Sequence, residues 1–148
     1  MNRRSFVIAA LTAAAAGRAN AQVSRNATLY KNPDCTCCDE YASYLRQHDF
    51  KVDVIATSEL DQIKKSKGVP QQFSGCHTTL VGGYVVEGHV PLKSIERLLR
   101  EKPKITGISL PGMPAGSPGM EVPSGQVDPY DTIAFDKAGK TRVFASHR

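Results

Sequence analysis

The sequence has no tryptophan, only four cysteines among 148 residues, and no long apolar run outside an alanine-rich beginning. A membrane-spanning helix needs about 20 consecutive apolar residues, so we do not expect the body of the chain to cross a bilayer. Four cysteines are too few for a small scaffold built from disulfides, and a hydrophobic content of 41% excludes a disordered chain. The length is that of one ordinary domain.

The body of the chain also lacks a strong net charge. The whole sequence has 19 basic and 14 acidic residues, but three of the arginines lie in the first 21 residues, where there is no acidic residue. The remaining 127 residues therefore carry sixteen basic and fourteen acidic side chains. A surface so close to neutrality gives no electrostatic reason to expect nucleic acid as a partner, and we exclude that class.

The first 21 residues have the features of an export signal. Arg3 and Arg4 form a positive beginning, a weakly apolar stretch follows, and Ala19-Asn20-Ala21 supplies small residues for cleavage. We therefore predict that the mature chain starts at Gln22 and is delivered to the periplasm, where disulfides can persist. The paired arginines also resemble a twin-arginine signal, which is an address read by a receptor. An ordinary secretory signal is the alternative.

The mature part, residues 22–148, alternates strand-like and helix-like segments and is predicted to form a single domain. The order of these segments indicates an α/β fold of the thioredoxin type, with a β-α-β-α-β-β-α core. A loop rich in proline and glycine, with two methionines, follows at 103–129, and two apolar runs after it predict a C-terminal β-hairpin. The predicted strands cover 27–30, 50–55, 79–81, 84–86, 132–135 and 142–145, and the predicted helices cover 38–48, the stretch between Ser58 and Gly68, and a segment opening at Pro91.

Cys35-Thr36-Cys37-Cys38 is the most informative stretch, because it places three thiols at the start of a predicted helix. A helix N-terminus presents unpaired N–H groups and a partial positive charge, which stabilise a thiolate. The spacing of Cys35 and Cys38 is that of a dithiol redox pair. Ordinary dithiol oxidoreductases, however, do not need the additional thiol of Cys37.

Crowded thiols favour a second interpretation, which is metal binding. Zinc sites usually take two cysteine pairs from separate loops, whereas soft sulfur ligands in a tight cluster suit Cu(I). We therefore favour a copper(I) site at Cys35, Cys37 and Cys38, with Cys76 as a fourth sulfur. A third interpretation, structural disulfides in an exported protein, stays open, since four cysteines allow three pairings.

The second cysteine segment, Gly75-Cys76-His77-Thr78, comes directly before the third predicted strand of the core. In the thioredoxin topology this segment lies opposite the start of the first helix, so we expect Cys76 and His77 to face the other cysteines. Thioredoxins carry a cis-proline here, but the nearest prolines in this chain are Pro70 and Pro91. The missing proline disfavours a general disulfide reductase.

Three further side chains outside the cysteine segments are candidate ligands. His89 follows a predicted strand and precedes a predicted helix. Met113 and Met120, apart from Met1 the only methionines of the chain, lie in the proline- and glycine-rich loop. Thioether sulfur is selective for Cu(I), although methionine in such a loop also fills apolar gaps.

Several motifs together resemble the CopG family of exported copper-resistance proteins, long described only as a domain of unknown function. They are Cys35 to Cys38, Gly75 to Thr78, Gly83 to Pro91, and Leu110 to Pro114 with Met120-Glu121. The resemblance extends over about residues 27–146. It implies a thioredoxin-like domain that binds Cu(I) through its C-x-C-C cysteines, with Cys76 nearby, and that takes part in periplasmic copper handling. A copper redox or thiol oxidoreductase role is suggested for the family.

We therefore expect an exported Cu(I)-binding protein of periplasmic copper resistance, whose partners are copper ions and other periplasmic copper-handling proteins. If its thiols also exchange electrons, Cys35 and Cys38 form the redox-active pair. A thiol-disulfide oxidoreductase of the thioredoxin superfamily is the alternative, and an enzymatic role stays open. The predicted metal ligands are Cys35, Cys37, Cys38, Cys76, His77, His89, Met113 and Met120.

Overall fold

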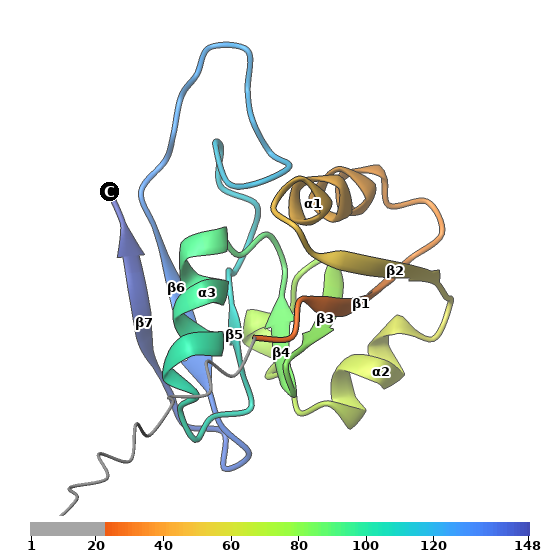
Figure 1. Ribbon diagram of the computed structural model, residues 1–148, viewed down its shortest axis with the longest axis vertical. Coiled ribbons are helices and arrows are strands. Elements are labelled where there is room, and N and C mark those ends of the chain that lie inside the picture. The colour runs from red at the N-terminus through yellow and green to blue at the C-terminus, as the bar shows by residue number, and fades with distance from the viewer. Residues whose placement is uncertain (1–22) are drawn as a thin grey trace, which may run out of the picture.

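The computed structural model describes residues 23–148, so the predicted export signal lies outside the described residues. One mixed sheet of seven strands runs through this part of the chain, in the order β2-β1-β3-β4-β5-β6-β7 (Figure 1). The strands are β1 (Asn26–Lys31), β2 (Lys51–Ala56), β3 (His77–Val81), β4 (Tyr84–Glu87), β5 (Gly107–Ser109), β6 (Tyr130–Phe135) and β7 (Thr141–His147). The helices are α1 (Thr36–Gln47), α2 (Leu60–Ser66) and α3 (Leu92–Glu101), with a short 3-10 turn at Gln71–Phe73.

The first four strands and three helices form the predicted core. Strands β1 and β2 are parallel and are joined through α1, while β3 pairs antiparallel with both β1 and β4. This is the predicted β-α-β-α-β-β-α order, and the α/β fold class is confirmed. Helix α1 packs against the sheet through one face, on which apolar residues recur at helical spacing. The buried residues of this face are Cys38, Tyr41, Ala42 and Leu45. The helix begins two residues earlier than predicted, so Cys37 and Cys38 lie within its first turn.

Strand β5 was not predicted, because it is short and lies inside the proline- and glycine-rich segment. It pairs parallel with β4 and antiparallel with β6, so the C-terminal hairpin continues the same sheet. Gly107 allows this close pairing: a Cβ there would collide with the carbonyl oxygen of Val85 and lie 2.9 Å from the ring of Phe135. Three residues that start with glycine give no readable alternation.

Side chains of β3 alternate between the two faces of the sheet and separate the helices. His77 lies against the Tyr41 ring of α1, with ring centroids 4.6 Å apart. The next residue, Thr78, accepts a hydrogen bond of 3.0 Å from Lys64 of α2. Neighbouring residues of a strand point to opposite faces, so α1 and α2 cover opposite faces of the sheet.

The loop from Leu110 to Pro129 leaves the sheet after β5 and passes next to α1 (Figure 1). Gly119 has φ +78, and a Cβ at this position would lie 3.1 Å from the Tyr41 backbone nitrogen and 3.3 Å from Nδ1 of His89. A positive φ and so close an approach both favour glycine. The loop therefore packs against α1 and His89, next to the predicted site residues.

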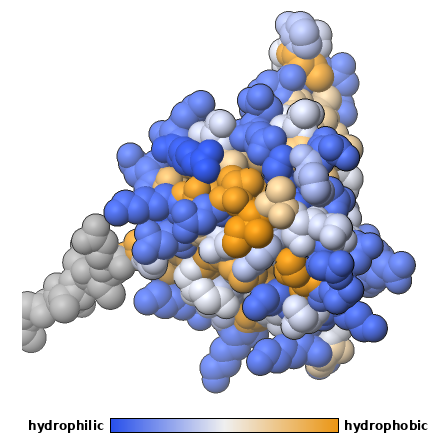
Figure 2. All heavy atoms as spheres, turned by 90° about the vertical axis from the view of Figure 1, so that its right-hand side faces the viewer, coloured by the Kyte–Doolittle hydropathy of each residue, from blue (hydrophilic) through white to orange (hydrophobic). Residues whose placement is uncertain are grey.

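The side of the molecule that carries β2 and α2 is largely hydrophilic. Figure 2 looks onto this side and shows apolar groups gathered in its middle, with hydrophilic groups around them. Ile55, on the edge strand β2, is 41% exposed. In the part of the chain that the structure describes, no helix combines the length and apolar character needed to cross a membrane.

Candidate functional site

The N-terminus of α1 presents the three clustered cysteines. Cys35 precedes the helix in an extended conformation and forms a disulfide with Cys38, whereas Cys37 is a free thiol. The Sγ atoms of Cys35 and Cys37 are 3.6 Å apart. Cys38 is fully buried, while Cys35 and Cys37 are partly exposed. The pair with redox spacing is thus oxidised in this structure, and the additional thiol, that of Cys37, lies directly beside it.

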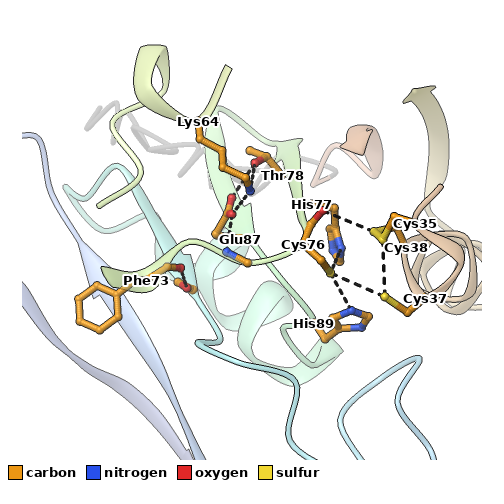
Figure 3. Close-up of polar contacts among 12 residues, drawn as sticks. Cys35, Cys37, Cys38, Lys64, Phe73, Cys76, His77, Thr78, Glu87 and His89 are labelled. Atoms are coloured by element: carbon orange, nitrogen blue, oxygen red, sulfur yellow. Dashed lines mark hydrogen bonds and ion pairs between the residues drawn. A yellow bond between two sulfur atoms is a disulfide. The ribbon is translucent and has the colours of Figure 1, made fainter. Parts of the chain in front are cut away.

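Cys76 lies opposite this helix start, as the thioredoxin topology predicts (Figure 3). Its sulfur is 3.9 Å from that of Cys37, and its carbonyl oxygen is 3.6 Å from the Cys38 sulfur. All four cysteine sulfurs lie within 4.8 Å of one another. Neither Cys37 nor Cys76 is in a disulfide, so the arrangement is not the pair of structural disulfides that four cysteines would allow.

Cys76 also belongs to a second group of donor atoms, with His77 and His89. Its sulfur lies 3.3 Å from Nδ1 of His77 and 3.1 Å from Nε2 of His89. The other ring nitrogen of His89 lies 2.7 Å from the carbonyl oxygen of Pro118. A carbonyl oxygen can only accept, so Nδ1 of His89 carries the proton and Nε2 presents its lone pair towards Cys76.

His77 is completely buried between the sheet and Tyr41, and its Nε2 has no hydrogen-bond partner. Burial, the neighbouring His89 and the Lys64 ammonium lower the pKa of His77 well below 6.5. Burial also lowers the pKa of His89, against the opposing effect of its hydrogen bond to Pro118. Both imidazoles are therefore neutral near pH 7, the form in which a ring nitrogen can coordinate a metal ion.

The Cys76 thiol is held in its protonated form by its surroundings. Burial, followed by the proximity of Cys37, raises the pKa of Cys76 from 9.0 to about 12, although Lys64 partly opposes this. A thiol with such a pKa reacts slowly as a nucleophile, but a soft metal ion can displace its proton. Cys76 is therefore better suited to metal coordination than to thiol exchange.

The two methionines of the loop are placed differently from the cysteines and histidines. Met113 is 51% exposed, and Met120 is partly buried two residues after the Pro118 carbonyl that contacts His89. The structure therefore brings four cysteines and two histidines together and attaches the methionine loop to them through His89. The ligand roles of Met113 and Met120 stay predictions.

Several buried polar residues around this site were not predicted from the sequence. The Tyr41 ring packs against both histidines, with its centroid 4.6 Å from that of His77 and 5.3 Å from that of His89, and its hydroxyl donates to the Val90 carbonyl at 2.7 Å. Lys31, Lys64 and Glu87 are each at most 6% exposed. A lysine or glutamate at a core-facing position of a strand or helix is the only sequence signal for such residues, and it is weak.

The comparisons with known proteins point to one family. The model of a family described as a protein of unknown function, DUF411, matches residues 73–120, from the Cys76 segment to Met120. No curated protein matches the sequence. Two solved structures, forms 2 and 1 of the copper resistance protein CopG, resemble the chain with TM-scores of 0.78 and 0.77. They share 33% and 34% sequence identity with it.

The structural match extends over nearly the whole of the described chain. It covers 83% of this chain and 98% of form 2, and 82% of this chain and 96% of form 1. Identity of this level over almost all of a relative's length goes beyond a shared fold. The chain therefore belongs to the CopG family of copper resistance proteins, as its sequence motifs predicted.

Proposed function

We propose that this protein binds copper(I) in the periplasm and so contributes to copper resistance. The proposal is carried by one observation: four cysteine sulfurs lie within 4.8 Å of one another, and one of them, that of Cys76, also contacts a nitrogen of each of the two imidazoles. Soft sulfur ligands bind Cu(I) in preference to hard cations, and imidazole nitrogen also suits copper. Its relatives are described as copper resistance proteins, which supports copper as the metal.

The ligands we propose are of three kinds. Cys35, Cys37, Cys38 and Cys76 supply thiolates once the Cys35–Cys38 disulfide is reduced, and His77 and His89 supply neutral nitrogens. Four sulfurs in so small a volume can bridge more than one ion. Met113 and Met120 are proposed as additional thioether ligands from the loop above the site.

The same thiols could supply electrons, and we propose copper and thiol redox chemistry as part of this function. Oxidation of the Cys35–Cys38 dithiol to the disulfide releases two protons and two electrons. The two electrons reduce two Cu(II) ions to Cu(I). The alternative, a thiol-disulfide oxidoreductase acting on other proteins, is favoured by the position of this disulfide at a helix N-terminus. The periplasmic location rests on the predicted leader and on the oxidising conditions under which such a disulfide persists.

Anaerobic titration of the reduced protein with Cu(I) tests this function. We expect two or more tightly held Cu(I) ions per chain, counted by metal analysis after desalting, and weaker retention of zinc in a parallel titration. Insulin reduction is measured on the same preparation. Absence of bound copper together with rapid insulin turnover would show that the protein is an oxidoreductase instead, and stronger retention of zinc would refute the preference for soft metals.

His89→Gln is expected to lower Cu(I) affinity by at least about 10-fold, since loss of even a hydrogen-bonding partner of a metal ligand typically costs about 10- to 100-fold. The substitution removes the nitrogen that lies 3.1 Å from Cys76 and also the hydrogen bond to Pro118. Competition with a Cu(I) chelator measures the change. His48→Gln is the matched control, because His48 lies at the opposite end of α1 and should leave the affinity unchanged. Equal affinities for the two variants would exclude His89 as a ligand.

A further inference from the structure

Lys31 contacts the segment that carries the first cysteines. It is the last residue of β1, and it is buried. Its ammonium donates to the Cys35 carbonyl at 2.9 Å and pairs with the Asp39 carboxylate at 2.7 Å. Lys31 is also the register partner of His77 across β1 and β3. One buried side chain thus connects the end of β1, the residue before α1 and the first turns of α1.

A second buried lysine, Lys64, acts through Glu87 on the segment that carries Cys76 (Figure 3). The Glu87 carboxylate accepts from the Gly75 backbone N–H at 2.8 Å and from the Thr78 hydroxyl at 2.7 Å. Lys64 pairs with the same carboxylate and donates to the Thr78 hydroxyl at 3.0 Å. Gly75 and Thr78 flank Cys76 and His77, so a single carboxylate holds the segment on both sides of these two residues.

The two lysines approach from opposite faces of the sheet. Lys31 shares the α1 face with its register partner His77, whereas Thr78 and its register partner Glu87 point to the α2 face, where Lys64 lies. Placing charges in a protein interior costs desolvation, and such pairs can often be replaced by apolar side chains without loss of stability. Their contacts with the backbone on either side of the cysteines suggest another use for them.

We propose that Lys31 and the Lys64–Glu87 pair are positioning residues that set the distance between the two cysteine segments. Lys31 fixes the approach to α1, and Glu87, held by Lys64, fixes Gly75 to Thr78. The inference rests on the proposed function, since the geometry so fixed is that of the copper ligands. A metal site needs its ligands held by surrounding hydrogen bonds, and removing such partners weakens binding by about 10- to 100-fold.

The test compares a double variant with a matched control. Lys64→Met together with Glu87→Met removes both charges and keeps side chains of similar length. We expect the thermal unfolding midpoint to stay close to that of the unaltered protein, because apolar replacement of a buried pair is often tolerated. Cu(I) affinity should nevertheless fall about 10- to 100-fold. Lys65→Met, which changes the exposed neighbour of Lys64 on the same helix, should leave the affinity unchanged.

A second readout needs no metal. In the reduced protein, the alkylation rates of individual cysteines are followed by mass spectrometry of their peptides. The double variant should accelerate alkylation of Cys76 relative to Cys37, because the segment held by Glu87 is released. Lys31→Met should change the rate of Cys35 and leave that of Cys76 unaltered, and it provides a second test should the double variant fail to fold.

The two readouts separate the inference from the function on which it rests. If the unaltered protein binds no copper but the alkylation rates shift as described, the proposed function is wrong and the positioning role is upheld. Folded variants with unaltered alkylation rates and unaltered copper affinity would overturn the positioning role.

Discussion

Cys76→Ser is expected to lower Cu(I) affinity by at least about a hundredfold, since even loss of a supporting partner costs 10- to 100-fold. In the part of the chain that the structure describes, Cys76 is the only residue shared by the two groups of donor atoms. Its sulfur contacts that of Cys37 on one side and both imidazoles on the other. Removing it separates the histidines from the remaining cysteines. Chelator competition and metal counting measure the loss.

Cys37→Ser is the informative comparison for this variant. Cys37 contacts only the sulfurs of Cys35 and Cys76 among the donor atoms, at 3.6 and 3.9 Å, so its loss leaves the histidine group intact. We therefore expect a smaller decrease in affinity than for Cys76→Ser. Thermal unfolding of both variants checks that the fold persists. A Cys76→Ser variant that holds as much copper as Cys37→Ser, equally tightly, would contradict the central position of Cys76.

The second large effect is on pH dependence: Cu(I) affinity should rise at least about tenfold per pH unit between about pH 6 and 8. Burial and the neighbouring Cys37 raise the pKa of Cys76 to about 12, so the free protein carries this proton throughout the range. Copper binds the thiolate and releases the proton. Because the complex holds fewer protons than the free protein, a higher pH favours the complex.

The contribution of Cys76 to this slope can be isolated. In Cys76→Ser the slope of log affinity against pH should fall by about one, because one proton fewer is released. The histidines should add little above about pH 6.5, because burial keeps their pKa values below the ordinary 6.5. Chelator competition at several pH values, corrected for protonation of the chelator, provides the measurement. Identical slopes for the two proteins would show that Cys76 does not lose a proton on binding.

The core of the fold could be predicted because its signals are local. Buried positions at helical spacing in α1 and apolar runs in β1, β3 and β4 are properties of short segments, and the order of segments restricted the topology. Strand β5 could not be predicted in this way. Its three residues become a strand only because β4 and β6 lie on either side of them.

The candidate site, like the fold, has features that local sequence predicts and features that depend on contacts between distant segments. Three thiols at a helix start were visible in the sequence, and the topology predicted that Cys76 lies opposite them. The proton position of His89 depends on the Pro118 carbonyl, which is 29 residues away in the chain. The contacts of Lys64 with Glu87 likewise join segments 23 residues apart.

The sequence by itself determined which chemical groups this protein has and on which elements they lie, because residue type and hydrophobic period act over a few neighbouring positions. The tertiary structure alone decided which of these groups meet. Contact between distant segments depends on how the sheet and its helices pack, and that packing also set which thiols are buried and which charged side chains hold the segments that carry them.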